Sequence, residues 1–161
     1  MNEQISTAEF NKEIPEGNLT PLPMLPEREW LEAIIVEVNY QYAEFKNEIQ
    51  FVKDEIGNIK LDEDGNPIKR REFEITFELP KFSLDNGEPR KQWLRLSSSR
   101  FKKAYLPGFL KNVGIDSDGV TPQKIIDELK NKKVKLQLAT KTKLDGSGQY
   151  QIVLHDTVRQ L

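Results

Sequence analysis

Cysteine is absent from the chain, which therefore forms no disulfide and offers no thiolate for a metal or for nucleophilic catalysis. The one histidine, His155, excludes a centre made of several imidazoles. No apolar run approaches the roughly 20 residues that a membrane span requires. The N-terminus also lacks the basic-then-apolar order of a secretory signal. These absences favour a cytoplasmic protein that is not an enzyme and holds no metal or other cofactor.

Charge is nearly balanced overall but is unevenly distributed along the chain. The 161 residues carry 26 acidic and 24 basic side chains. Residues 1–65 hold 15 acidic and 5 basic side chains, whereas residues 66–161 hold 11 and 19. This asymmetry indicates either a basic surface for an anionic partner or an acidic half that folds back on the basic half.

The first 26 residues have the composition of a flexible tail. They contain four prolines and an acidic excess, and their apolar residues follow no period. Such a segment buries too little surface to offset the entropy lost on ordering, although residues 19–25 could lie extended against the domain. We expect a tail over residues 1–26 and one domain over residues 27–161. Turn signals at Gly57-Asn58 and Asp64-Gly65-Asn66-Pro67 predict an inserted β-hairpin over about residues 53–70.

Alternation of apolar and polar residues predicts five main strands. They are Trp30–Tyr42, Glu72–Leu79, Lys91–Ser97, Val134–Lys141 and Tyr150–His155. In the first, even-numbered apolar residues run from Trp30 to Tyr40, while the odd-numbered positions are apolar only up to Ile35, so we expect burial on both faces early and on one face later. In the second, apolar residues from Phe73 to Leu79 alternate with polar residues on a wet face, and Pro80 ends the strand. In the last, parity places Tyr150 in the core.

Shorter segments connect these strands. Phe45–Phe51 either continues the first strand or starts a hairpin. A helical segment from Phe101 is expected to end at Pro107-Gly108. Thr121-Pro122 predicts a second helix, because threonine is a good N-cap and proline suits the first helical position. Asn131 is a plausible end for that helix.

The order of these elements predicts an all-β chain with one or two helices, folded as a five-stranded OB-fold barrel with an inserted hairpin and an extended N-terminal arm. The stretches Trp93–Leu96, Phe109–Gly114 and Ile125–Val153 resemble bacteriophage and mobile-element proteins of the single-stranded-DNA-binding type. The resemblance rests on element order and apolar spacing. It departs from the pattern at Asn131, where those proteins usually have glycine before a lysine.

The resemblance implies non-catalytic, largely sequence-independent binding of single-stranded DNA in phage or mobile-element replication or recombination. Single-stranded RNA is an alternative ligand. The expected protein partners are further copies of the chain or replication and recombination proteins, and no membrane is implied. The alternative function is a protein–protein interaction module, in which the same OB-like barrel binds a peptide or an accessory protein.

Single-strand binding requires cations for phosphates and aromatic faces for bases. Lys91, Trp93 and Arg95 meet this need on one face of the third predicted strand. The alternative is that both cations pair with glutamates of the neighbouring strand, while Trp93 packs under the tail. The other candidates come from basic clusters, each of which is also typical of a solvated surface, and from further aromatic residues: Lys69, Arg70, Arg71, Arg100, Lys102, Lys103, Lys133, Lys135, Tyr40, Tyr42 and Phe82.

Overall fold

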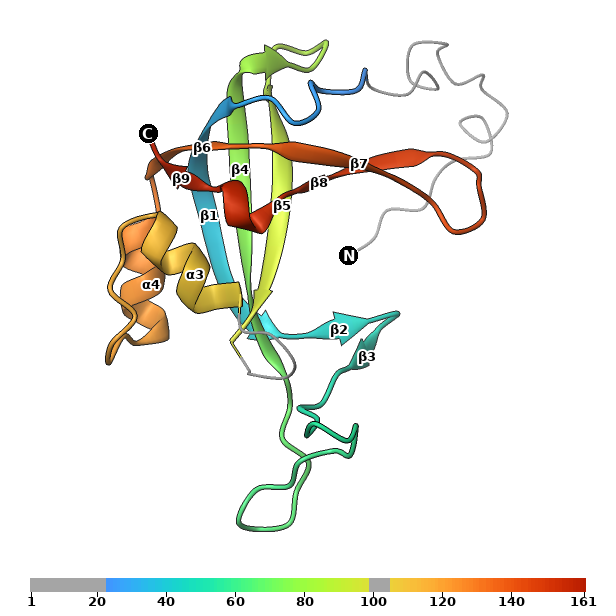
Figure 1. Cartoon of the computed structure of the whole chain (residues 1–161), viewed down its shortest axis with the longest axis vertical. Coiled ribbons are helices and arrows are strands. Elements are labelled where there is room, and N and C mark those ends of the chain that lie inside the picture. The colour runs from blue at the N-terminus through green and yellow to red at the C-terminus, as the bar shows by residue number, and fades with distance from the viewer. Residues whose placement is uncertain (1–22, 99–104) are drawn as a thin grey trace, which may run out of the picture.

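A five-stranded antiparallel sheet organises the computed structural model, which describes residues 23–98 and 105–161 (Figure 1). The strand order is β5-β4-β1-β6-β9. The bounds are β1 Leu31–Tyr42, β4 Arg71–Ser83, β5 Pro89–Ser97, β6 Lys133–Leu136 and β9 Arg159–Gln160. The helices α3 (Tyr105–Asn112) and α4 (Pro122–Leu129) follow β5 in the chain. The prediction of a β-dominated chain with one or two helices is confirmed for these residues.

Two hairpins extend from this sheet (Figure 1). Strands β7 (Leu138–Thr142) and β8 (Gln149–Val153) form one of them. Strands β2 (Glu44–Phe45) and β3 (Glu48–Ile49) form the other. The chain that follows it is joined by isolated bridges, of which the outermost links Phe51 and Lys69. We call residues 43–70 the arm. Its two predicted turns are confirmed: in each, an aspartate side chain, Asp54 or Asp62, accepts hydrogen bonds from backbone N–H groups two and four residues later.

A β-bulge at Val36 divides β1 into two halves. Ile35 pairs with Phe77 and Glu37 with Thr76, so Val36 has no partner on β4. Because side chains alternate along a strand, the extra residue moves the core face from odd to even positions. Three odd-numbered residues are buried before the bulge, Leu31, Ala33 and Ile35, whereas Val38 is buried after it. The prediction that both faces are buried early is therefore wrong, because only the odd-numbered face is, whereas later burial of the even-numbered face is confirmed at Val38.

Strand β4 supplies the centre of the core. Its predicted apolar face is confirmed, since Phe73, Ile75, Phe77 and Leu79 are buried. The opposite face is not uniformly wet, because Glu72 and Thr76 are buried as well. The prediction that Pro80 ends the strand is wrong. Pro80 lies beyond the last residue paired with β1 and within a register shift against β5, so no ladder hydrogen bond requires its missing N–H.

The two helices differ in how well the sequence predicts them. The N-cap of α4 is confirmed, because the Thr121 hydroxyl accepts a hydrogen bond from the Lys124 N–H at 3.2 Å. Asn131 follows the helix with a φ of 67° and donates its N–H to the Ile35 carbonyl at 2.7 Å. The prediction that Pro107-Gly108 ends a helix is wrong. Pro107 lies in the first turn of α3, where a proline leaves no intrahelical bond unmade.

The C-terminal part also departs from the predicted pattern. The predicted strand from Val134 to Lys141 is interrupted at Gln137, between β6 and β7. Tyr150 is exposed rather than buried, because β8 leaves the core as it approaches the hairpin tip, and only Val153 at its other end is buried. His155 lies in a short 3-10 helix, η1 (His155–Thr157), and not in a strand.

Leu25 joins the hydrophobic core, although its sequence position is in the predicted tail. The Gln151 side chain holds this segment by hydrogen bonds to both the backbone N–H and the backbone carbonyl of Leu25. Its amide oxygen accepts from the Leu25 N–H at 2.9 Å, and its NH₂ group donates to the Leu25 carbonyl at 2.8 Å. Residues 1–22, the rest of the predicted tail, lie outside the described residues.

Phe77→Ala should lower the free energy of unfolding by about 3–5 kcal/mol, because the ring is fully buried and its removal leaves a cavity. Urea denaturation measures this change. Ile56→Ala is the control: Ile56 is 86% exposed on the arm, so its loss should change stability by less than about 0.5 kcal/mol. Equal effects of the two substitutions would contradict the assigned core face of β4.

Candidate nucleic-acid interface

The C-terminal half of β1 meets the start of β4 where the core ends. After the bulge, Tyr40 pairs with Phe73 and Tyr42 pairs with Arg71, all on the core-facing side. The ring centroids of Tyr40 and Phe73 lie 4.7 Å apart, so Tyr40 closes the core. Beyond it, the strand partner of Tyr42 is Arg71 and not an aromatic residue, and the Tyr42 side chain is 45% exposed. The bulge therefore places an accessible aromatic ring at the edge of the core.

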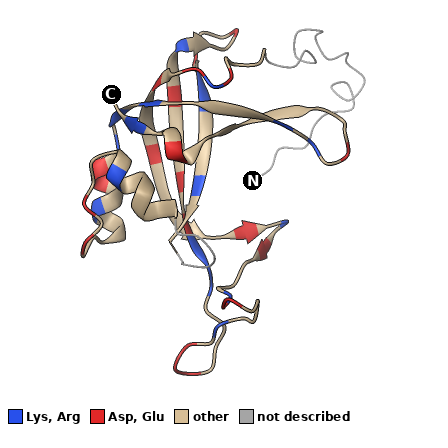
Figure 2. Cartoon of the chain, viewed as in Figure 1, with Lys and Arg blue, Asp and Glu red and all other residues tan. Residues whose placement is uncertain are grey.

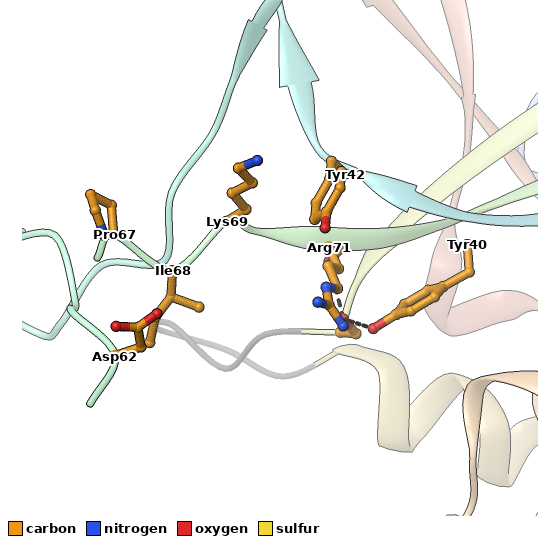
Figure 3. Close-up of a pocket in the computed structure, with 8 residues that line it drawn as sticks. Tyr40, Tyr42, Asp62, Pro67, Ile68, Lys69 and Arg71 are labelled. Carbon is orange, nitrogen blue, oxygen red and sulfur yellow. Dashed lines mark hydrogen bonds between the residues drawn. The ribbon is translucent and has the colours of Figure 1, made fainter. Parts of the chain in front are cut away.

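Two cations surround this ring, as Figure 3 shows. The Lys69 Nζ lies 5.1 Å and the Arg71 Cζ 5.6 Å from the centroid of Tyr42. With Tyr40, these residues border a hollow of about 570 Å³ between the sheet and the arm. We call this site the tyrosine pocket. Its lining is Tyr40, Tyr42, Asp62, Pro67, Ile68, Lys69, Arg71 and Ser98.

Hydrogen bonds hold the floor of the tyrosine pocket. The Ser98 hydroxyl donates to the Arg71 carbonyl at 3.2 Å and lies 3.4 Å from the Tyr40 hydroxyl. Hydrogen bonding to Tyr40 is the main cause that raises the pKa of Arg71 above its ordinary value. An arginine is cationic even at its ordinary pKa, so Arg71 contributes a positive charge to the pocket. Asp62 is the one acidic residue among the lining residues. The pocket therefore presents an aromatic face together with a net positive charge.

The outer face of β5 has a different electrostatic character. Lys91, Trp93 and Arg95 project there as expected, and Trp93 is 56% exposed. However, Arg95 forms an ion pair with Glu74, with Nη2 and Oε2 2.9 Å apart, and lies 3.9 Å from Glu72. Strand register also places Glu78 opposite Lys91. The pairing alternative is thus realised for Arg95, which leaves fewer free cations beside Trp93 than the sequence suggests.

Burial gives Glu72 an unusual protonation equilibrium. The residue is only 6% exposed, and desolvation raises the pKa of its carboxyl, while the positive charges of Arg95 and Arg70 oppose that shift. Arg70 itself donates from Nε to the Ser97 hydroxyl at 3.2 Å. Arg95 therefore pairs most closely with Glu74, and at 3.9 Å its charge also opposes the effect of burial on Glu72.

A second aromatic and basic cluster lies on β1, β6 and β9. Before the bulge, even positions of β1 face outward, and Trp30 directly precedes the strand with 48% of its surface exposed. The Lys135 Nζ lies 4.9 Å and the Arg159 Cζ 5.7 Å from the indole ring centroid. Lys133 is two residues from Lys135 on the same strand face. We call these four residues the indole patch, and Figure 2 shows its cations on β6 and β9.

Sequence reasoning identified Lys133 and Lys135 as candidates but missed Trp30 and Arg159. The signal available for Trp30 was its place in the first strand, yet without the bulge its face could not be assigned. Arg159 gave no signal, since the pairing of β9 with β6 is a long-range contact. Of the remaining candidates, Phe82 packs against the core. Arg100, Lys102 and Lys103 lie outside the described residues.

No protein-family model matches the chain, and no curated protein matches it significantly in sequence. Within residues 23–98 and 105–161, no cluster of three His, Cys, Asp or Glu side chains is arranged to hold a metal ion. The helices of that part of the chain are too short or too polar to cross a bilayer.

The pH dependence of stability should reveal the buried carboxyl of Glu72. Since burial raises its pKa above the ordinary 4.5, the folded state binds this proton more tightly than the unfolded chain does. Its stabilising contribution is therefore complete below pH 4.5 and is lost as pH rises through the folded-state pKa. Glu72→Gln removes this titration, so its free energy of unfolding relative to wild type should increase with rising pH.

Urea denaturation at several pH values measures this difference. Glu44→Gln, which changes an exposed carboxylate on the arm, is the control and should show no such trend. Parallel stability profiles for wild type and Glu72→Gln would contradict a raised pKa at Glu72.

Proposed function

We propose that this protein binds single-stranded DNA without catalysis and largely independently of sequence, and that the tyrosine pocket is the principal contact. The observation that carries the proposal is the exposed ring of Tyr42, with Lys69 and Arg71 within 5.1 and 5.6 Å of its centroid beside a hollow of about 570 Å³. A hollow of this size falls within the range of about 300–1,000 Å³ typical of ligand sites.

The pocket supplies the two interactions that a single strand requires. A base stacking on an aromatic ring contributes about 1–3 kcal/mol, and every base has a π-face, so this contact tolerates any sequence. Lys69 and Arg71 are close enough to the ring to contact phosphates that flank a base bound there. Binding of phosphates releases counterions and makes affinity depend on salt.

We propose further that the sheet is a variant of the OB-fold barrel. Supporting this, β1 pairs with both β4 and β6, and α3 and α4 lie between β5 and β6 in the chain. In such a barrel, the contact of β5 with β8 would be the side at which the sheet closes, although no hydrogen-bonded ladder joins these two strands among the described residues. OB-folds bind oligonucleotides beside the loop that follows their first strand, which corresponds here to the arm.

In this proposal the protein acts in phage or mobile-element replication or recombination, and RNA is the alternative strand. The second candidate function is a protein-interaction module. It is favoured by the arm, which exposes five large apolar side chains: Phe45, Ile56, Ile59, Leu61 and Ile68. Residues 43–66 of the arm carry seven acidic and three basic side chains, so this segment repels phosphate rather than attracting it.

Tyr42→Ala should weaken binding of oligo-dT by about 1–3 kcal/mol, with little change in the salt dependence, because stacking releases no counterions. Lys69→Ala and Arg71→Ala should each reduce the slope of log K against log salt by about 0.7, since each removes one phosphate contact. Fluorescence anisotropy of labelled oligo-dT at several salt concentrations measures both effects.

Tyr105→Ala is the matched control, because Tyr105 is similarly exposed but its ring is covered by His155 at a centroid distance of 4.1 Å. This variant should bind as wild type does. Wild-type protein that binds no oligonucleotide even at low salt would contradict the proposed function and favour the protein-interaction module. Normal binding by Tyr42→Ala would contradict the assignment of the tyrosine pocket.

A further inference from the structure

We infer that the indole patch is a second, separate contact for single-stranded nucleic acid, in which Trp30 stacks on a base while Lys133, Lys135 and Arg159 contact phosphates. This inference rests on the proposed function but uses a different surface. The two cations measured near the indole lie 4.9 and 5.7 Å from its ring centroid, as close as the cations of the tyrosine pocket are to Tyr42.

Strand register builds the indole patch. Glu32 pairs with Lys135, and Lys135 pairs in turn with Arg159, so outward side chains of three strands lie side by side. The inward neighbours are apolar and buried, which fixes the backbone beneath the patch: Leu31, Val134, Leu136 and Val158. The patch is therefore a rigid platform rather than a loop.

Local charge favours an anionic ligand at this platform. The one acidic side chain that register places within the patch is Glu32, and it is engaged by Lys81 at 3.3 Å. Lys133, Lys135 and Arg159 are then in excess. The contrast is the other exposed indole, Trp93, whose neighbour Arg95 is engaged by Glu74. Among the described residues, an exposed tryptophan and surplus cations coincide at Trp30.

The two contacts are far apart. Trp30 precedes β1 and Tyr42 ends it, and the bulge turns them to opposite sides of the sheet. Twelve residues at about 3.3 Å each separate them by roughly 40 Å along the strand. A short oligonucleotide can therefore occupy one contact only, whereas a long strand that reaches both gains affinity, because its second contact forms within the complex.

The chain has only two tryptophans, Trp30 and Trp93, so each single replacement leaves one intrinsic fluorophore. The experiment titrates full-length Trp93→Phe and Trp30→Phe with short oligo-dT at low salt. We expect quenching in Trp93→Phe, where Trp30 reports, and no change in Trp30→Phe. Trp30→Ala should bind long oligo-dT roughly 5- to 150-fold more weakly, the change that corresponds to about 1–3 kcal/mol of stacking.

A matched pair of cation variants completes the test. Arg159→Ala should reduce the salt slope by about 0.7, whereas Lys91→Ala on β5 should leave it unchanged. Unchanged Trp30 fluorescence, together with binding that Tyr42→Ala abolishes, overturns this inference and leaves the proposed function intact. Trp30 quenching with normal affinity of Tyr42→Ala supports the inference and overturns the tyrosine pocket.

The last titration uses a synthetic peptide of residues 52–64, which is the acidic and apolar part of the arm. Quenching of Trp30 by this peptide but not by oligo-dT overturns the inference, because the patch is then a surface for an acidic protein segment. The Trp93→Phe titration leaves Trp30 in place, so the inference stays testable even if Trp30→Ala fails to fold.

Discussion

The single unpaired residue in β1 is the constraint on which the arrangement of both aromatic sites depends. Strand β1 is bonded to β4 along most of its length and to β6 at its start, so its register is held from two sides. The strand therefore cannot slip along its partners to accommodate the extra residue Val36. Instead, every residue of β1 after Val36 faces the side opposite to the one its number would predict. Trp30, directly before β1, faces outward and Tyr42, at the end of β1, lies at the edge of the core, although both are even-numbered.

Pairing of charges decides which of the basic residues remain available. The positive half of the chain is not a uniformly basic surface, because Arg95 neutralises Glu74 and the buried Glu72, and Lys81 engages Glu32. The cations beside Tyr42 and beside Trp30, at the two ends of β1, form no such ion pair with a carboxylate of residues 23–98 or 105–161. The arm extends from the sheet and carries most of its acidic side chains away from it (Figure 2), and of these only Asp62 is among the described residues that line the tyrosine pocket.

Features encoded by short sequence patterns could be predicted, and those that depend on long-range contacts could not. Thr121-Pro122 specifies its own helix start, and alternation from Phe73 to Leu79 specifies a core face. The bulge leaves no local signal, because Val36 suits a strand on either face, and Pro107 marks a helix start as readily as a helix end. Tyr42, Lys69 and Arg71 could be named as candidates, but only the pairing of β1 with β4 brings them into one pocket.

The central claim is that two aromatic clusters at opposite ends of β1 contact one kind of ligand, a single nucleic-acid strand. Backbone amide exchange, measured with and without a long oligo-dT, tests it most directly. The account predicts slower exchange at residues 40–42 and 69–71 and, separately, at residues 133–135 and 159. Slower exchange confined to β5 or to residues 43–66 of the arm, or no change anywhere, would contradict it.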